Sequence, residues 1–374
     1  MKILHINAGN ETGGGMYPIL HLLKELNRDE FILGVFEEGE LLRRANKLGI
    51  KTVCFANKAK FSITLIKQIA TYMKKEGVNY VHTHGPRANV YAHMLKRIID
   101  FNWIVTVHSD PDHDFLDKGL YGDFLTLLNM RAIKHADRII TVSEQFKDKL
   151  THLGIADHKI NCILNGIDFN KNISVLYRKE DFGLTKHDFV ILMVARLEAV
   201  KGHQLAFQAL KQLVKFYKKT HLMLIGDGSL KNSLQQNALS LNIENNVHFL
   251  GYRNDVDYFY KVADVTLLTS LSESFPLVLL ESARAKTPVI STDVGCVRKL
   301  IPHEQLGWVI KPNDVHQLTK SLTEALALFK RGLLTIRGRN LYEFASTQFS
   351  VSTFADKTYH VYLSLEETDE GTKL

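Results

Sequence analysis

Short runs of apolar residues alternate with stretches of helical periodicity along most of the chain. In the first half the runs cover residues 2–6, 31–36, 79–83, 103–107, 138–142 and 160–164. Runs of this length are typical of buried strands. Between them apolar residues recur at three- and four-residue spacing, most clearly over residues 16–26 and 62–76. Strands that alternate with helices predict a parallel sheet covered by helices on both faces.

A polar stretch without firm periodicity, residues 170–187, separates this pattern from a second copy of it. The alternation restarts with apolar runs at 189–194, 221–225, 246–250, 265–270, 289–292 and 308–310. Helices are expected between these runs, including one over 276–285 and one over 315–329 with Asn313 or Asp314 as its N-cap. A last helical pattern covers 355–365, and residues 366–374 are expected to fray. The sequence predicts two α/β domains, 1–168 and 188–350, joined by a linker over 169–187.

In open parallel sheets, ligands bind outside the carboxyl ends of the strands. We therefore expect a ligand cleft between the two halves. The residues that follow each predicted strand are the first candidates for chemistry.

Composition narrows the class of protein. The 374 residues are 45% hydrophobic and 23% charged, as in a water-soluble globular protein. No apolar run approaches the ~20 residues that span a bilayer, and no signal peptide can be drawn. The three cysteines, Cys54, Cys162 and Cys296, lie in or beside apolar runs and lack metal-ligand spacing. They favour a reducing, cytoplasmic location.

The net charge of +7 is unevenly distributed. Residues 41–97 contain twelve Lys or Arg and one acid, Glu76, whereas residues 100–123 contain six Asp and one base, Lys118. A basic region of this kind can bind an anionic membrane surface or a phosphorylated substrate. The alternative is a solvated basic face without a partner. A nucleic-acid partner is not expected, because no recognisable binding motif is present.

The segment from 272 to 283 holds two carboxylates, Glu273 and Glu281, around a predicted helix start at Pro276. Proline suits a first helical turn, where its missing N–H would have no partner. The helix N-terminus offers free N–H groups to an anion or to sugar hydroxyls, and the carboxylates can accept from several hydroxyls. The alternative is an ordinary capped surface helix.

Two glycine-rich turns follow predicted strands. Gly13-Gly14-Gly15 follows the first strand and opens a helix, so its backbone can approach a phosphate. It is not the dinucleotide fingerprint, because Pro18 occupies the third glycine position. This disfavours a nicotinamide dehydrogenase. The second turn, Gly226-Asp227-Gly228, is also explained by turn chemistry alone.

Arg196 and Lys201 follow the first strand of the second half. Two cations there could neutralise a diphosphate; the alternative is surface salt bridging. His108 ends another strand and is predicted to point into the same cleft, although a lone histidine is more often structural. We expect His82 and His84 to lie on opposite faces of their strand, which argues against a metal-binding pair.

These motifs together resemble the retaining glycosyltransferases of family 4, which have the two-Rossmann-domain GT-B fold. The resemblance runs from residue 1 to about 365. It is carried by the glycine loop, Thr106-Val107-His108, Ala195-Arg196-Leu197 with Lys201-Gly202, Gly226-Asp227-Gly228, and Glu273-x7-Glu281, all in the family's order.

The resemblance implies roles for these residues. Arg196 and Lys201 stabilise the leaving nucleoside diphosphate, Glu281 accepts from the ribose hydroxyls, and Glu273 and His108 contact the donor sugar. Gly14, Gly15, Gly226, Ser274 and the backbone amides of Phe275, Leu277 and Val278 add donor contacts, and Tyr252 and Arg253 pack on the base. The helix 355–365 crosses back to the first, acceptor-binding domain.

The expected activity is retaining, metal-independent transfer of a sugar from a nucleoside diphosphate sugar, UDP-linked in our interpretation, to an acceptor hydroxyl. The charge pattern favours a glycan or lipid-linked acceptor at the inner membrane face, as in polysaccharide or teichoic acid assembly. No cofactor other than this co-substrate is expected. The alternatives are a GT-B phosphorylase, a nucleotide-sugar epimerase, or a non-catalytic nucleotide-sugar-binding subunit.

Overall fold

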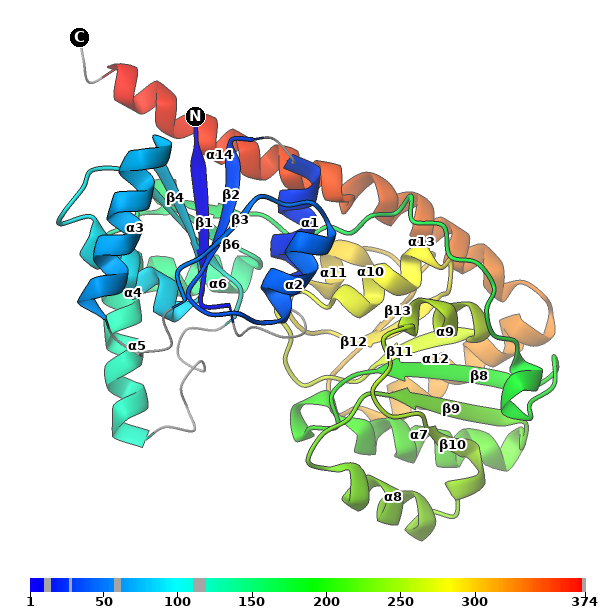
Figure 1. Cartoon of the computed structure of the whole chain (residues 1–374). Coiled ribbons are helices and arrows are strands. Elements are labelled where there is room, and N and C mark those ends of the chain that lie inside the picture. The colour runs from blue at the N-terminus through cyan, green and yellow to red at the C-terminus, as the bar shows by residue number, and fades with distance from the viewer. Residues whose placement is uncertain (10–14, 27–28, 57–61, 110–118, 372–374) are drawn as a thin grey trace. The chain divides into compact units, whose positions relative to one another are not determined.

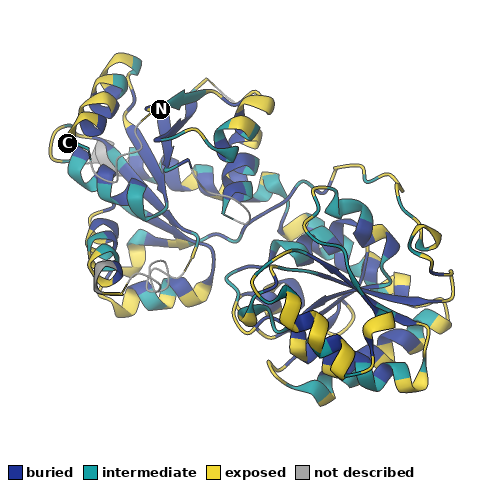
Figure 2. Ribbon diagram, turned by 60° about the horizontal axis from the view of Figure 1, so that its bottom comes forward, coloured by how far each residue is buried: buried dark blue, intermediate teal, exposed yellow. Residues whose placement is uncertain are grey.

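The computed structural model describes residues 1–374 except 10–14, 27–28, 57–61, 110–118 and 372–374 (Figure 1). The chain divides into two compact units. The first unit contains Met1–Asp168 and the C-terminal segment Val351–Leu374, and the second contains Phe169–Ser350. In each unit a parallel sheet forms the buried centre, and the exposed positions gather on the outer surfaces of the helices (Figure 2).

The first unit is built on a seven-stranded parallel sheet of order β3-β2-β1-β4-β5-β6-β7. Its strands are β1 (Ile3–Asn7), β2 (Phe31–Val35), β3 (Thr52–Cys54), β4 (Tyr80–His84), β5 (Asn102–Val107), β6 (Arg138–Thr141) and β7 (Ile160–Cys162). The helices that cover it are α1 (Met16–Leu26), α2 (Glu40–Lys47), α3 (Ile63–Glu76), α4 (Pro86–Leu95), α5 (Gly119–Lys134) and α6 (Glu144–His152).

The C-terminal helix α14 (Val351–Gly371) belongs to the first unit and packs against α1 (Figure 1). Tyr362 and Leu365 are buried in the same apolar cluster as Ile3 of β1 and Leu23 of α1. The helix is longer than the predicted 355–365, because it starts four residues earlier and continues through positions that lack an apolar pattern.

The second unit has a six-stranded parallel sheet of order β10-β9-β8-β11-β12-β13. Its strands are β8 (Phe189–Val194), β9 (Thr220–Ile225), β10 (Val247–Phe249), β11 (Val265–Leu268), β12 (Val289–Thr292) and β13 (Trp308–Ile310). Its helices are α7 (His203–Phe216), α8 (Lys231–Ser240), α9 (Val256–Val262), α10 (Leu277–Arg284), α11 (Val297–Leu300), α12 (Val315–Lys330) and α13 (Leu334–Gln348). Asp314 caps α12 by accepting from the Gln317 N–H at 2.8 Å.

Sequence and structure differ at several places in the fold. Residues 169–187 do not form a separate linker, because Tyr177 and Phe182 pack against Phe259 of α9. The short elements α2 and β3 lie in a stretch where no element was expected. The helix α13 was also missed. Its buried side includes Gly338, where a Cβ atom would lie 2.0 Å from the Lys286 carbonyl oxygen, so a small residue lets α13 approach the end of α10.

Each sheet reverses its strand order at one point. In the first unit β1 lies between β2 and β4, and in the second β8 lies between β9 and β11. The crevice at the carboxyl ends of the strands beside such a reversal is the usual ligand site of doubly wound sheets. The loops after β8 and β11 therefore mark the candidate site of the second unit.

Glycines hold the loops at this edge of the second sheet together. A Cβ atom at Gly226 would lie 1.9 Å from the Ala195 oxygen, one at Gly202 would lie 2.1 Å from the Thr269 oxygen, and one at Gly295 would lie 2.4 Å from the Glu273 oxygen. Side chains do not tolerate such distances, so the loops after β8, β9, β11 and β12 touch through bare backbone. Hydrogen bonds reinforce the contact: Thr269 Oγ1 donates to the Lys201 carbonyl oxygen at 3.0 Å.

We predict that Gly226→Ala disrupts this contact. Both Gly226 and Gly251 have positive φ, but a Cβ atom at Gly251 meets nothing within 4 Å. Gly251→Ala should therefore cost only the backbone strain of about 1–2 kcal/mol. Gly226→Ala should add overpacking of roughly 1–3 kcal/mol. Chemical denaturation of both variants measures the difference, and equal losses of unfolding free energy would contradict the close-contact interpretation.

Candidate functional site

Lys201 and Glu273 meet at the strand-order reversal of the second unit. Lys201 Nζ lies 2.6 Å from Glu273 Oε1, and both side chains are largely buried. Ser270 Oγ donates to the same carboxylate oxygen at 2.6 Å. The loop after β8 is thereby fixed to the loop after β11. Since an ammonium group has three donors, Lys201 keeps two N–H groups for a ligand.

Arg196 lies in the same loop as Lys201, two residues after the end of β8. Its side chain is exposed, and it pairs with no carboxylate among the described residues. An unpaired guanidinium can bind phosphate oxygens with a two-pronged geometry. The edge of the sheet therefore carries one cation that is held by an acid and one that is available to an anion.

Helix α10 begins at Leu277, and Pro276 is its N-cap. The expectation that Pro276 belongs to the first helical turn was wrong by one residue, because its ψ of 103° is extended. Leu277 and Val278 are the first two helical residues, and their N–H groups have no acceptor within the helix. An anion or a sugar hydroxyl can occupy such donors.

Glu281 lies in the second turn of α10 and faces α9. The Tyr260 hydroxyl donates to Glu281 Oε2 at 2.8 Å. Burial raises the pKa of Glu281 above its ordinary value, although the hydrogen bond from Tyr260 opposes the shift. The carboxylate is thus oriented by a buried phenol.

The loop between Glu273 and α10 is held in place by a buried aromatic contact and a backbone hydrogen bond. The Phe275 ring is buried and lies 5.4 Å from the Phe349 ring, centroid to centroid. The Ser274 carbonyl oxygen accepts from the Cys296 N–H at 3.2 Å. Phe275 can therefore offer a ligand only its backbone.

Tyr252 and Arg253 follow β10 on the far side of β9. The Tyr252 side chain is 68% exposed and is available for stacking. Arg253 is already engaged, because it donates to both oxygens of Asp255, at 2.8 and 2.7 Å, and to the Tyr177 hydroxyl at 2.9 Å. The guanidinium holds the pKa of Asp255 at about 2.

In the first unit, His108 directly follows β5 and is partly buried. Its Nε2 lies 3.0 Å from His84 Nδ1, and burial lowers the pKa of His108 to about 4. Gly15 is the residue before α1, whereas Gly14 lies outside the described residues. His108 is therefore a neutral imidazole that is held by a second histidine.

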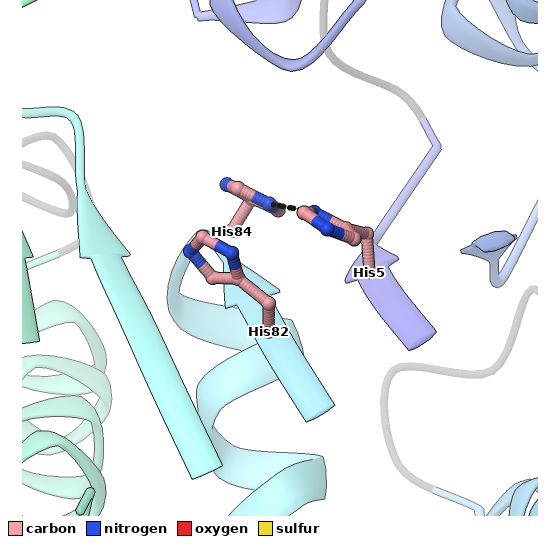
Figure 3. Close-up of side chains that lie close together, drawn as sticks. All are labelled: His5, His82 and His84. Atoms are coloured by element: carbon pink, nitrogen blue, oxygen red, sulfur yellow. Dashed lines mark hydrogen bonds between the residues drawn. The ribbon is translucent and has the colours of Figure 1, made fainter. Parts of the chain in front are cut away.

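The expectation that His82 and His84 lie on opposite faces of their strand was wrong. Side chains two residues apart share a face. Together with His5 they form, within the described part of the chain, the one group of three potential metal ligands (Figure 3). All three are buried, and burial lowers each pKa.

Sequence reasoning missed several residues of these sites: His5, Asn7, Tyr260, Ser270 and Tyr362. Asn7 ends β1 and its side chain donates to the His84 carbonyl oxygen at 3.1 Å. Position at a strand end would have identified Asn7. Nothing in the sequence pairs Tyr260 with Glu281, or Ser270 with Glu273, before the fold is known.

The second unit thus brings together an exposed arginine, a lysine with spare donors, a helix N-terminus and two oriented carboxylates. The positive groups can bind an anion, and Glu273 and Glu281 can accept hydrogen bonds from hydroxyls. An anion that carries several hydroxyl groups fits this combination best.

Two family models match the chain. Residues 13–171 match the model described as Glycosyltransferase Family 4, and residues 177–331 match the one described as Glycosyl transferases group 1. These two ranges fall largely in the first and the second unit, respectively.

Relatives of known name agree with these models. An Escherichia coli enzyme named UDP-Gal:alpha-D-GlcNAc-diphosphoundecaprenol alpha-1,3-galactosyltransferase is 26% identical over 319 residues, which cover 81% of each chain. N-acetyl-alpha-D-glucosaminyl L-malate synthase of Bacillus anthracis is 25% identical over 325 residues, 84% of this chain and 82% of its own. The structure of Anabaena HepE in complex with UDP matches with a TM-score of 0.83 and 20% identity, over 97% of this chain and 100% of that one. The expected family and fold are confirmed: the chain belongs to the glycosyltransferases of family 4 and has their GT-B fold.

Proposed function

We propose that this glycosyltransferase takes a sugar from a nucleoside diphosphate sugar, UDP-linked, and transfers it with retention to an acceptor hydroxyl. The observation that carries the proposal is the pair of cations at the strand-order reversal, Arg196 and Lys201, on a loop held against the loop before α10. The E. coli relative is named for a UDP-galactose donor, and HepE was solved with UDP.

The demanding step is departure of the diphosphate. The bond from the anomeric carbon to phosphate breaks and a bond to the acceptor oxygen forms on the same face, while the departing phosphate takes the acceptor proton. Negative charge grows on the diphosphate, where Arg196, Lys201 and the first N–H groups of α10 receive it. Fixed donors aimed at developing charge lower a barrier because they need little reorganisation. In this proposal the two cations replace a metal ion.

The hydroxyl groups of the donor go to the carboxylates. Glu273 is partly engaged through Oε1, and its second oxygen accepts from the donor sugar. Glu281 accepts from the ribose hydroxyls, in the orientation that Tyr260 sets. The exposed Tyr252 ring stacks on the base, and Arg253 holds that loop through Asp255.

The first unit is proposed to bind the acceptor, with Gly15 near the diphosphate and His108 near the sugar. We infer a glycan or lipid-linked acceptor in envelope synthesis, since the E. coli relative is named for a diphosphoundecaprenol acceptor. Among the described residues, no helix is long and apolar enough to cross a bilayer.

One helix in the basic region suits attachment to a membrane surface. Ile63, Lys67 and Lys74 of α3 are exposed and lie on one face at helical spacing. Five other bases of the region, Arg43, Arg44, Lys51, Arg87 and Lys96, pair with acids. The basic excess that remains for a partner is therefore smaller than the sequence count suggests, and α3 carries part of it.

Release of the nucleoside diphosphate should depend on an acceptor. An epimerase would release none, a phosphorylase would release sugar phosphate, and a binding subunit would not turn over. Lys201→Ala should lower kcat by ~10²-fold or more, as loss of one transition-state donor does. Lys215→Ala on the exposed side of α7 serves as the control. Activity of Lys201→Ala within a few-fold of wild type would remove Lys201 from its role.

Glu281→Gln should have different effects on donor binding and on the stability of the folded protein. The amide oxygen keeps the acceptor for Tyr260 but removes the charge, so donor Kd should rise about tenfold as a charged hydrogen bond becomes a neutral one. Because the pKa of Glu281 is raised by folding, ionisation costs stability, and the wild type should lose stability relative to the Glu281→Gln variant as the pH rises past 4.5. Calorimetry measures the donor Kd, and unfolding at several pH values measures the difference in stability. An unchanged donor Kd would contradict the ribose assignment.

Binding to lipid vesicles tests whether α3 attaches the protein to a membrane. Lys67→Glu with Lys74→Glu should weaken binding to anionic vesicles at low salt by at least about tenfold, because each basic residue near such a surface contributes ~1 kcal/mol. Lys218→Glu with Lys320→Glu makes the same charge change at exposed sites of the second unit. Equal vesicle binding by the two variants, or no binding by the wild type, would exclude attachment through α3.

A further inference from the structure

The buried histidines of the first unit form one continuous series of hydrogen-bonding contacts. His108 Nε2 lies 3.0 Å from His84 Nδ1. His84 Nε2 lies 3.0 Å from His5 Nδ1 (Figure 3). His5 Nε2 lies 3.5 Å from the Tyr362 hydroxyl. The same hydroxyl lies 2.7 Å from His82 Nδ1, and His82 Nε2 lies 2.6 Å from Thr106 Oγ1. The series therefore uses both ring nitrogens of His84, His5 and His82.

Burial keeps these rings neutral. His5, His82 and Tyr362 are 0% exposed and His84 is 2% exposed. Burial lowers the pKa of His5 to about 3 and those of His82 and His84 well below 6.5. Burial also raises the pKa of Tyr362, so its hydroxyl keeps its proton. A neutral imidazole has one donor and one acceptor nitrogen.

Two arrangements remain if each ring donates from one nitrogen and accepts on the other, and if the Tyr362 hydroxyl donates to one histidine and accepts from the other. If His108 donates from Nε2, then His84 accepts on Nδ1 and must donate from Nε2 to His5. His5 then donates from Nε2 to the Tyr362 hydroxyl, and this hydroxyl donates to His82 Nδ1. All four rings therefore carry the proton on Nε2. In the reverse direction all four carry it on Nδ1. A mixture among His108, His84 and His5 places two donors or two acceptors face to face, and such a buried mismatch costs ~1–3 kcal/mol. A mixture at Tyr362 either has the same mismatch or makes the hydroxyl accept from both His5 and His82, so that its proton goes to neither histidine.

A metal ion fits the same atoms less well. Zinc lies 2.0–2.1 Å from histidine nitrogens, so two ligands of a tetrahedral ion are about 3.3 Å apart. His5 Nδ1 and His84 Nε2 are 3.0 Å apart, which is a hydrogen-bond distance. No carboxylate belongs to the histidine group in the described part of the chain. A shared metal would also break the contact between His5 and His84.

We propose that His108, His84, His5, Tyr362, His82 and Thr106 form a single directional chain, which sets the protonated nitrogen of His108. Nδ1 of His108 has no partner among the described residues, so it is the end of the chain that can meet a ligand. In one arrangement it accepts a hydrogen bond, and in the other it donates one. His84, His5 and Tyr362 act as positioning residues for His108, and its contact with sugar rests on the proposed function.

This hydrogen-bond series also connects the ligand edge of the sheet to the C-terminal helix. Tyr362 comes from α14, whereas its histidine partners come from β1 and β4. Packing of α14 on the first unit thus contributes one hydroxyl without which His5 and His82 are not linked. Its contact with His5 at 3.5 Å is the longest of the series, and its contact with His82 at 2.7 Å is the shorter and stronger of the two that the hydroxyl makes.

Nitrogen NMR of the full-length protein, labelled with 15N only in histidine, tests the chain directly. Long-range proton–nitrogen spectra at neutral pH identify the protonated nitrogen of each ring, and single His→Gln substitutions assign the four signals. We expect His5, His82, His84 and His108 to share one protonated nitrogen, or one common fraction if the two arrangements exchange. A mismatch among His5, His84 and His108 would overturn the proposal, as would a stoichiometric metal content of the purified protein.

Tyr362→Phe tests the hydroxyl link while keeping the packed ring. The signals of both His5 and His82 should change, because each loses a partner. Tyr72→Phe makes the same substitution in the same unit, where the ring packs against Phe55, and should leave all four signals unchanged. If neither His5 nor His82 responds to Tyr362→Phe, Tyr362 is not part of the chain. Thr106→Val provides a second probe at the other end, where only the His82 partner is removed.

Measuring transferase activity provides a second test, which depends on the proposed function. Loss of one link should lower kcat about 2–10-fold in Tyr362→Phe, the equivalent of one hydrogen bond, with donor Kd unchanged and with Tyr72→Phe at the wild-type rate. If the wild type lacks transferase activity, the proposed function fails while the NMR result still decides the chain. If the signals agree but kcat of Tyr362→Phe is that of wild type, the chain does not act through His108.

Discussion

Contact between bare backbones at the carboxyl edge of the second sheet determines where its charged groups lie. Gly202, Gly226 and Gly295 each occupy a point where a side chain would collide with the neighbouring loop. The loops after four adjacent strands consequently form one rigid rim. Lys201 and Glu273 are on two of these loops, and their ion pair at 2.6 Å is a consequence of the contact as well as a reinforcement of it. A rim fixed in this way can present charge to a ligand with little rearrangement, which is what electrostatic stabilisation of a leaving group requires.

The carboxyl edge of the first sheet carries a different kind of polar group. Its polar groups are buried imidazoles, and burial makes charge on them unfavourable. Neutral rings can be satisfied only by pairing donors with acceptors, and the structure pairs them in series from His108 to Thr106. The two sheet edges thus differ: that of the second unit carries fixed charge, and that of the first unit carries neutral groups whose donor and acceptor roles are coupled.

Much of the fold follows from the sequence because strand and helix periodicities are local. The alternation, the two domains and the cap at Asp314 are examples. The helix α13 was not predictable in the same way, since Gly338 weakens its helical pattern for a reason that lies in Lys286, far along the chain. The partnership of Lys201 with Glu273 spans 72 residues, and each had been assigned a separate role. Position after a strand identifies candidate residues, but their pairing depends on which strands are neighbours.

The most direct measurement is a crystal structure of the protein with UDP bound. We expect the diphosphate to lie against Arg196 and Lys201 and to accept from the N–H groups of Leu277 and Val278, with the ribose hydroxyls at Glu281. A diphosphate bound elsewhere on the second unit, with the pair of Lys201 and Glu273 remote from it, would show that these cations do not receive the leaving group.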